Sequence, residues 1–384
     1  MWEYGSHPQT PKLPYPHTHS PMQSASVYIH IPFCVRKCLY CDFTSYPGKE
    51  GLFEEYVEAL RAEIRLAAAR FPNVRVPTVY FGGGTPNVLS PDQLTSILDE
   101  IRQSFDVSAD AEITIESNPG LPIIRDGFNR LSLGVQSFHD NELQALGRIH
   151  TAEEATQAFC AAEFSNISID LMYGIPGQTP DSWRHTLDKA LDLGPKHISL
   201  YSLTIEEGTP YWDMCQSGRL ELPDNDIEAD MYELAIEVLT RAGYEHYEIS
   251  NFTKPGFQCR HNITYWRNES YFGFGVGATA YLDGCRATNV RSVEAYIAGS
   301  SVESEECLAG KAAMGETMFL GLRMLRGVDV NAFGRRYGMT PQEAFPEEIA
   351  DLLGRGLIEA APDAIRLTHR GLLLANDVFA EFVC

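Results

Sequence analysis

The sequence has few basic residues. It contains 30 Lys and Arg against 52 Asp and Glu in 384 residues, a formal net charge of −22, and its pI is near 4.9. Proteins that bind nucleic acid in general rely on Lys and Arg at the phosphates. This charge balance therefore excludes that class, and we expect no nucleic acid among the partners.

Long hydrophobic runs are also absent. No apolar run approaches the ~18 residues that span a bilayer, and the first 24 residues lack the basic start and apolar centre of a signal peptide. Residues 1–25 are instead rich in Pro, His, Ser and Thr. We expect a cytoplasmic protein whose residues 1–25 form a disordered tail.

The cysteines do not suggest a disulfide framework. There are nine, an odd number, and six of them are widely scattered: Cys160, Cys215, Cys259, Cys285, Cys307 and Cys384. In a chain of this length without a signal peptide, such scatter favours a reducing compartment.

From residue 26 onward, β-branched apolar segments alternate with helical ones. The expected strands are 27–31, 78–81, 112–116, 130–135, 168–172, 197–203 and 245–249, and the expected helices are 52–70, 91–105, 152–164, 181–193 and 226–242. This alternation predicts an α/β fold with a parallel sheet, open or closed into a barrel, and helices outside, over residues 26–300.

Residues 301–384 have a different pattern. Three helices (311–325, 330–337 and 347–355), a small strand (364–368) and a closing helix (370–382) predict a winged-helix-like domain. Winged helices often bind DNA. Here 8 Lys and Arg stand against 13 Asp and Glu, a net charge of −5, so the pattern favours packing or partner docking.

Polar and glycine residues gather where the expected strands end. Three cysteines follow the first strand, GGGTP (residues 82–86) follows the second, and the next three strands carry Glu116, Gln136 and Asp170. Parallel sheets bind ligands beyond the carboxyl ends of their strands. We therefore expect one site at one mouth of the barrel.

Cys34, Cys38 and Cys41 lie within eight residues in YIHIPFCVRKCLYCDF (residues 28–43). Structural zinc normally takes four protein ligands, so zinc would need a remote ligand such as Cys259. The Cys38–Cys41 spacing also allows a redox pair. The third interpretation is a [4Fe–4S] cluster in which three thiolates hold three irons and the fourth iron stays open.

The cysteine motif, followed by GGGTP, resembles the radical S-adenosylmethionine (radical SAM) superfamily. The resemblance implies a partial (β/α)6 barrel, a [4Fe–4S] cluster on the three cysteines, and SAM chelating the open iron. Tyr40 corresponds to an aromatic residue that accompanies such clusters. The positions that match SAM contacts are Tyr28, Gly83, Gly84, Thr85, Glu116, Gln136, Arg148 and Asp170.

Further motifs narrow the resemblance to one branch. GVQSF, ALGRIH, DLMYGIPGQT, HISLYSLTIEEGT, GYEHYEISNF and GFGVGA are similar to the branch that holds coproporphyrinogen III dehydrogenase (HemN) and the HemW heme chaperones. The dehydrogenases carry another cysteine two places after the third, where this chain has Phe43. They also carry an extended N-terminal segment, whereas 33 residues precede Cys34 here. Both features favour the chaperone side.

HNITYW (residues 261–266) resembles the heme-binding motif of the chaperones. Imidazole ligates heme iron and aromatic rings offer flat apolar surface, so the resemblance implies that His261 binds heme. Cys259 is a second ligand or an uninvolved thiol. The structural alternative is a polar turn in which His261 caps a helix and the aromatic residues belong to the core.

The resemblance implies a chaperone that binds heme and delivers it to respiratory enzymes, with peripheral association at the inner face of the cell membrane. The alternative is an enzyme, the oxygen-independent coproporphyrinogen III dehydrogenase. It would use SAM-derived radical chemistry for oxidative decarboxylation.

Overall fold

The computed structural model of the chain describes residues 22–300 and 302–383. Residues 1–21, most of the expected tail, therefore lie outside the described residues. Residues 22–25 lead directly into the sheet, because Ala25 is buried and its backbone N–H donates to the carbonyl of Arg75 at 3.1 Å.

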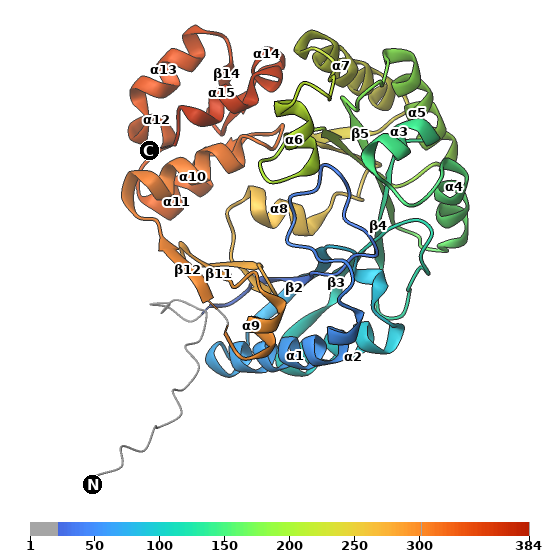
Figure 1. The fold of residues 1–384 in the computed structure, drawn as a ribbon. Helices are drawn as coiled ribbons and strands as arrows, with labels where there is room; N and C mark the ends of the chain where they lie inside the picture. The colour runs from blue at the N-terminus through green and yellow to red at the C-terminus, as the bar shows by residue number, and fades with distance from the viewer. Residues whose placement is uncertain (1–21, 301, 384) are drawn as a thin grey trace.

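Six consecutive strands run parallel in one curved sheet (Figure 1). They are β1 (Ser26–Ile31), β2 (Arg75–Gly83), β3 (Asp106–Ser117), β4 (Arg130–Gln136), β5 (Ile167–Tyr173) and β6 (His197–Ser202). The strands are short, mostly buried and rich in Ile, Leu and Val, as expected for a parallel sheet covered on its outer face. The predicted α/β architecture with a parallel-strand barrel is confirmed.

The helices between the strands are α1 (Phe53–Arg70), α2 (Pro91–Ser104), α3 (Asp140–Leu146), α4 (Ala152–Ala161), α5 (Pro180–Leu193), α6 (Pro210–Gln216) and α7 (Asn225–Arg241). Most of them cover the outside of the sheet (Figure 1). Helix α6 instead lies against the loop after β1, where the Tyr211 N–H donates to the carbonyl of Leu39 at 3.1 Å. Three of the helices begin with a capping box, in which the side chains of Ser90, Thr151 and Thr179 accept from the third backbone amide of the helix. Local sequence therefore determines where these helices begin.

Short strands extend the sheet at both edges. On one side β8 (Asn251–Thr253) and β7 (Glu245–Glu248) continue from β6 in antiparallel pairing. On the other, β9 (Tyr271–Phe274) pairs parallel with β1, and β10 (Thr279–Leu282), β11 (Cys285–Asn289) and β12 (Val302–Cys307) follow antiparallel. Two short helices, α8 (Arg260–Trp266) and α9 (Val293–Ile297), lie between these strands in the chain. Apart from β7, the sequence did not predict these elements, because they are short and lack a clear period.

The C-terminal part has its own apolar core. It contains α10 (Gly310–Gly321), β13 (Val328–Asp329), α11 (Val330–Tyr337), α12 (Pro341–Ala344), α13 (Pro346–Gly354), β14 (Ile358–Ala360), β15 (Ala364–Leu367), α14 (His369–Leu373) and α15 (Ala375–Ala380). The three strands form an antiparallel sheet. The single closing helix predicted over 370–382 is wrong, because Leu374 leaves the helical region at φ −116°, ψ 31° and divides it into α14 and α15.

One disulfide differs from the expectation of scattered free thiols. Cys285 on β11 and Cys307 on β12 are direct register partners and form a disulfide. The two residues are 22 positions apart in sequence, so only the strand pairing brings them together. Cys160, Cys215 and Cys259 are free thiols, and Cys384 lies outside the described residues.

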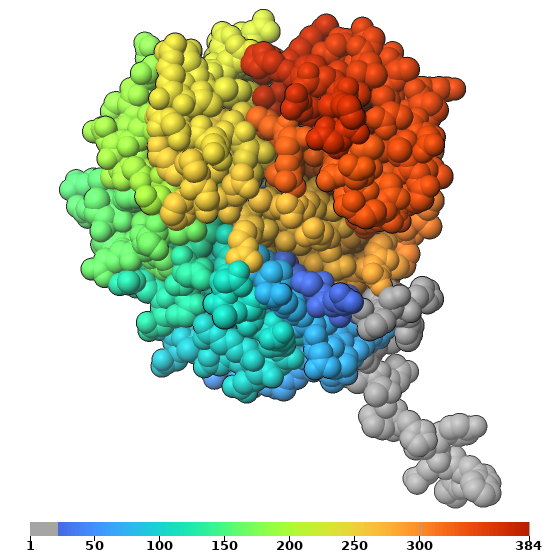
Figure 2. Space-filling model, turned by 180° about the vertical axis from the view of Figure 1, so that it is seen from behind, coloured from blue at the N-terminus to red at the C-terminus, as the bar shows by residue number. Residues whose placement is uncertain are grey.

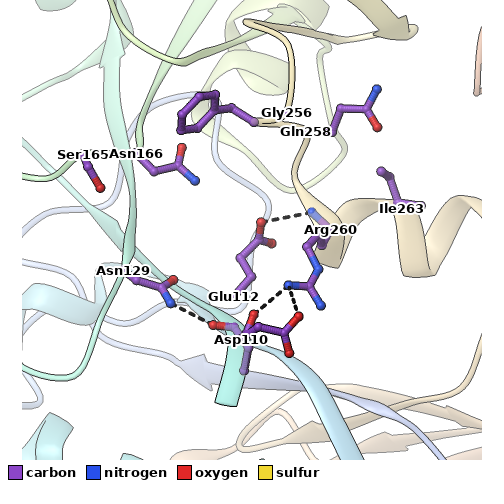
Figure 3. Close-up of a pocket in the computed structure, with 11 residues that line it drawn as sticks. Asp110, Glu112, Asn129, Ser165, Asn166, Gly256, Gln258, Arg260 and Ile263 are labelled. Atoms are coloured by element: carbon purple, nitrogen blue, oxygen red, sulfur yellow. Dashed lines mark hydrogen bonds and ion pairs between the residues drawn. The ribbon is translucent and has the colours of Figure 1, made fainter. Parts of the chain in front are cut away.

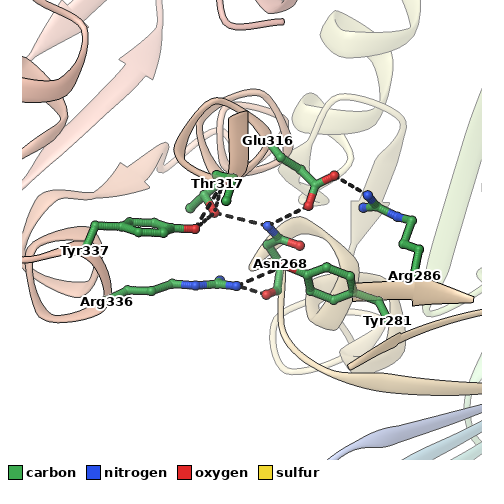
Figure 4. A network of polar contacts seen from close by, with 8 residues as sticks. Asn268, Tyr281, Arg286, Glu316, Thr317, Arg336 and Tyr337 are labelled. Atoms are coloured by element: carbon green, nitrogen blue, oxygen red, sulfur yellow. Dashed lines mark hydrogen bonds and ion pairs between the residues drawn. The ribbon is translucent and has the colours of Figure 1, made fainter. Parts of the chain in front are cut away.

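A polar network joins the C-terminal part to the barrel (Figure 4). Glu316 on α10 is buried, forms an ion pair with Arg286 on β11, and accepts from the side-chain amide of Asn268 at 3.1 Å. Arg336 on α11 donates to the backbone carbonyl of Asn268 at 2.8 Å. Asn268 follows α8 directly, and Figure 2 shows the orange-to-red C-terminal part packed beside the gold segment of the chain. The C-terminal part therefore holds the end of α8 in place.

We predict that Glu316→Ala destabilises the protein by about 2–3 kcal/mol, because it leaves the Arg286 guanidinium and the Asn268 amide without their buried partner. Urea denaturation of the apo protein measures this loss. Glu359→Ala is the matched control, since its ion pair with Arg366 is half exposed on both sides and exposed pairs contribute about 0–1 kcal/mol. Equal losses in the two variants would contradict the assigned role of Glu316.

Candidate metal and cofactor site

A cavity of about 350 Å³ opens at the carboxyl ends of the parallel strands. It is lined by eleven of the thirteen residues predicted from the sequence: Cys34, Cys38, Tyr40, Cys41, Gly83, Gly84, Thr85, Glu116, Gln136, Arg148 and Asp170. These eleven residues lie together at one mouth of the barrel, as the sequence predicted. Their roles remain predictions.

The cysteine loop follows β1 and forms one wall of the cavity. The three thiols are free and half-buried, and burial raises the pKa of Cys34 and Cys41. Arg36 anchors the loop, since its guanidinium donates to the carbonyls of Gly147 and Arg148 at 2.7 and 2.6 Å. Arg36 therefore fixes the loop to the segment after α3, and the three cysteines line the cavity.

The donor set fits an iron–sulfur cluster better than zinc. Throughout residues 22–300 and 302–383, no three His, Cys, Asp or Glu side chains are gathered as a single metal ion would need. Cys259, the remote ligand that zinc would require, is buried elsewhere, with its thiol directed at the Glu112 carboxylate at 3.7 Å. Three thiols on one wall of an open cavity are the arrangement that a cluster with one free iron requires. Ser117 also lines the cavity, and its buried hydroxyl has no hydrogen-bond partner among the described residues.

The glycines after β2 are required by the protein itself. Gly83 has φ +107°, and a Cβ there would lie 2.5 Å from the His30 ring. A Cβ on Gly84 would lie 2.6 Å from the carbonyl oxygen of Phe33. The sequence suggested that these glycines let the backbone approach a ligand. The structure adds that they let β2 pack against the start of the cysteine loop.

Two carboxylates line the cavity in protonation states set by burial. Glu116 accepts from the Tyr80 hydroxyl at 2.8 Å and from the Gly83 N–H at 3.2 Å, and burial raises its pKa to about 7. Asp170 accepts from the Ser132 hydroxyl at 3.0 and 3.1 Å, and burial raises its pKa as well. A cationic ligand would favour the ionised form of both groups.

Arg148 directs its guanidinium at the cysteine loop. One terminal nitrogen lies 3.5 Å from the Cys38 sulfur, and the other donates to the side-chain oxygen of Asn118 and, at 2.8 Å, to the carbonyl of Gly134. Gln136 nearby has φ +68° where the pairing of β4 with β5 shifts register, an uncommon conformation for a residue other than glycine. The irregular end of β4 therefore gives Arg148 and Gln136 access to the same cavity.

The two predicted tyrosines lie at different depths. Tyr40 lines the cavity, and burial raises its pKa. Tyr28 is not among the lining residues. It lies inside the barrel, where its hydroxyl bonds to His30 at 3.1 Å and its ring stacks on Tyr80 at 6.2 Å.

His261 lies away from the cavity of the cysteines, near the amino-terminal part of β2. Its Nδ1 bonds to the Thr78 hydroxyl at 2.8 Å and its Nε2 to the Tyr265 hydroxyl at 2.9 Å, and the residue is 1% exposed. Burial lowers its pKa to about 3. An axial ligand needs a free ring nitrogen, so this conformation does not offer His261 to heme iron. The motif here forms helix α8, with the imidazole satisfied in the core.

A second cavity, of about 590 Å³, lies beside α8 (Figure 3). Arg260 and Ile263 of α8 line it together with Glu112 of β3. The Glu112 carboxylate accepts from the backbone amides of Arg260 and His261 at 3.1 and 3.0 Å. Glu112 therefore fixes the start of α8 to β3, and only part of the heme-like motif faces this cavity.

Some residues of the site were not predicted. Asn118, Ser132 and Tyr80 make the hydrogen bonds that orient Arg148, Asp170 and Glu116. Asn118 follows β3 in the segment SNP, and a polar residue just past a parallel strand was the available signal. Ser132 and Tyr80 lie on strand faces that point into the barrel, and the sequence pattern alone did not identify them as site residues.

Comparisons with known proteins agree with this geometry. Residues 28–190 match the radical SAM superfamily, and residues 308–374 match the HemN C-terminal domain. The chain is 41% identical to the heme chaperone HemW of Bacillus subtilis, over 93% of this chain and 99% of that protein. It is 35% identical to the heme chaperone HemW of Escherichia coli, over 93% and 98% of the two chains.

Among solved structures, coproporphyrinogen III oxidase (HemN) from Escherichia coli, described as a radical SAM enzyme, is similar in fold. The TM-score is 0.81 at 25% sequence identity, and the match covers 94% of this chain and 91% of that chain. The likeness therefore includes both the barrel and the C-terminal part.

Glu116 gives a prediction for the pH dependence of stability. Its pKa is about 7 in the folded protein against an ordinary 4.5, so between these values the folded state holds a proton that the unfolded state has lost. Its contribution is fully present below pH 4.5 and is lost as the pH rises through 7, by up to about 3 kcal/mol. Urea denaturation of the apo protein from pH 4.5 to 8 should show this fall in the wild type. Glu116→Gln, which cannot ionise, should show a shallower one, and parallel curves would refute the assignment.

Proposed function

The chain belongs to the HemW family of radical SAM proteins, and from this membership we propose that it is a heme chaperone that binds heme, a [4Fe–4S] cluster and SAM. Its proposed task is the delivery of heme to respiratory hemoproteins. The observation that carries the proposal is the single cavity in which three free cysteines meet Gly83, Glu116 and Asp170. Identity to relatives named heme chaperone HemW along 93% of the chain supports the choice within the superfamily.

In this proposal Cys34, Cys38 and Cys41 would hold the cluster and leave one iron without a protein ligand, where SAM would bind. The cluster supplies the electron chemistry of the site. The chain's own residues bind and orient the ligand. The backbone at Gly83 faces the amine, Glu116 and Asp170 balance its positive charges or bind ribose, and Arg148 supplies a fixed positive charge. The remaining proposed cofactor contacts are Tyr40, Gly84, Thr85 and Gln136, which line the cavity, and Tyr28, which lies inside the barrel.

The proposed heme ligand, His261, requires a movement of α8. In the described conformation both ring nitrogens are bonded and the start of α8 is fixed by Glu112. The end of α8 is held as well, since the Arg323 guanidinium lies 4.3 Å above the Trp266 ring and Asn268 is bound by α10. Heme binding at His261 therefore has to displace the bond to Thr78 or the bond to Tyr265. We expect such binding to be slow compared with diffusion.

We propose a cytoplasmic location, with peripheral association at the inner face of the membrane during heme delivery. In the part of the chain that the structure describes, no helix is both long enough and apolar enough to cross a bilayer. Heme-accepting respiratory enzymes are the proposed partners.

The heme site is tested by titrating heme into the anaerobically reconstituted protein and following the Soret band. We expect a saturable heme spectrum in the wild type and at least a tenfold weaker one in His261→Ala, because that variant removes the only imidazole of the motif. His197→Ala is the matched control, since His197 is an equally buried histidine of the barrel interior, bonded to Ser168 and Tyr247. An absent heme spectrum would reject the chaperone function. A wild-type heme spectrum in His261→Ala would reject only the assignment of His261 as the heme ligand.

The alternative is oxygen-independent decarboxylation of coproporphyrinogen III, and the structural likeness to HemN favours it. Phe43 argues against it, because this residue, 63% exposed at the rim of the cavity, stands where the resemblance places a further cysteine in the dehydrogenases. We predict that the reconstituted protein, incubated anaerobically with SAM, a reductant and coproporphyrinogen III, yields no protoporphyrinogen above a Cys38→Ser control. Product formation at many turnovers per cluster would establish the enzyme instead.

A further inference from the structure

Asn118 lies between two groups that contact the cysteine sulfurs. Its side-chain oxygen accepts from Arg148, whose other terminal nitrogen lies 3.5 Å from the Cys38 sulfur. Its side-chain nitrogen donates to the Thr85 hydroxyl at 2.9 Å, and that hydroxyl lies 3.3 Å from the Cys34 sulfur. One amide therefore contacts the hydrogen-bond partners of two of the three cysteines.

The chemistry of Arg148 decides how the Asn118 amide is oriented. A guanidinium has only donors, so the Asn118 atom that it meets has to be the oxygen. The other end of the amide is then the NH2 group, which has only donors, and the Thr85 oxygen has to accept from it. The hydroxyl hydrogen of Thr85 is thereby left for the Cys34 sulfur. The orientation of one amide thus makes Thr85 a donor to sulfur.

The backbone around Asn118 keeps the amide in this position. Its N–H donates to the side-chain oxygen of Asn87 at 3.3 Å, and Asn87 is 3% exposed. A Cβ on Gly134 would lie 3.0 Å from the Asn118 oxygen and 3.3 Å from the Arg148 guanidinium, so a side chain there would crowd the contact between them. Thr85 itself is buried at 3% exposure, which limits competition from water for its hydroxyl.

We propose that Asn118 is a positioning residue that raises the reduction potential of the cluster through Thr85 and Arg148. Hydrogen bonds to cysteine sulfur stabilise the reduced, more negative cluster and so raise its potential. The proposal rests on the proposed function in one respect, that Cys34, Cys38 and Cys41 carry the cluster. It adds that Asn118, which need not touch the cluster or SAM, sets how readily the cluster accepts an electron.

The test is an EPR-monitored redox titration of the reconstituted protein without SAM, arranged as a double-mutant cycle. Thr85→Val removes the donor at nearly constant volume. We expect it to shift the ratio of oxidised to reduced cluster about tenfold toward oxidised at a fixed potential, which is ~59 mV for a one-electron couple. Thr85→Ser keeps the hydroxyl and should keep the wild-type potential. Thr114→Val is the control, because the buried Thr114 hydroxyl has no partner among the described residues and does not line the cavity.

Asn118→Asp isolates the role of the amide. An aspartate still accepts from Arg148, but its second oxygen accepts from Thr85 and turns that hydroxyl away from the Cys34 sulfur. Thr85→Val should therefore have almost no further effect in the Asn118→Asp background, and the added charge cancels because both members of that pair carry it. An equal Thr85→Val shift in both backgrounds would overturn the proposal.

A second measurement detects the hydroxyl hydrogen itself. Pulsed EPR of the reduced cluster in D2O should show an exchangeable deuteron coupling that is present in the wild type, is assigned to Thr85 by its loss in Thr85→Val, and is also lost in Asn118→Asp. An unchanged coupling would also overturn the role of Asn118. Iron and sulfide analysis separates this proposal from the proposed function. A wild-type protein without a cluster refutes both, whereas a cluster whose potential and coupling ignore these variants refutes only this one.

Discussion

The site depends on how the cysteine loop packs across the end of β2. The Gly84 N–H donates to the carbonyl of Ile31 at 2.8 Å, which continues the pairing of β1 with β2 one residue past the end of β2. Any side chain at Gly83 or Gly84 would collide with His30 or with the backbone at Phe33. Because the loop starts from this contact, the positions of Cys34, Thr85 and the Gly83 amide are set together. The cysteine loop and the end of β2 therefore pack together and form adjoining parts of the cavity lining.

Polar side chains inside the barrel connect the cavity of the cysteines to helix α8. Tyr80 donates to Glu116 at the cavity and stacks at 5.0 Å on His261. Several buried hydroxyl, imidazole and carboxyl groups of the strands and of α8, among them Thr78, His261 and Glu116, bond to one another or to neighbouring hydroxyls, which lowers the cost of burying them. Tyr80 therefore contacts both Glu116, which lines the cavity of the cysteines, and His261 of the HNITYW motif, which lies outside that cavity. A change in the charge of Glu116 alters the bond that Tyr80 makes, and the stacked His261 ring is its next neighbour.

The C-terminal part stabilises the end of α8 through buried polar contacts. Buried Glu316 and the Arg336 guanidinium both bind Asn268, the second residue after α8. The acidic balance of residues 301–384 had favoured packing over DNA binding, and the described contacts are packing contacts. Glu112 at the start of α8 and this network at its end enclose the motif on both sides. Helix α8 is therefore held at both of its ends.

Much of the fold and the composition of the site could be predicted from the sequence. The six parallel strands followed from their β-branched runs, because a strand buried on both faces has to be apolar along its length. The cysteine spacing, GGGTP and the polar residues at strand ends indicated nine residues of the cavity, because carboxyl ends of parallel strands meet at one edge. The family resemblance added Tyr40 and Arg148. Tertiary contacts decided the rest. The pairing of β9 with β1, the Cys285–Cys307 disulfide and the orientation of the Asn118 amide each join residues distant in sequence. His261 shows the difference most clearly. The sequence identified the HNITYW motif as a candidate heme-binding motif. Only the tertiary structure determined that both ring nitrogens of His261 are bonded, one to Thr78 of β2 and the other to Tyr265 of α8. A buried imidazole bonds to whichever partners the fold brings within reach.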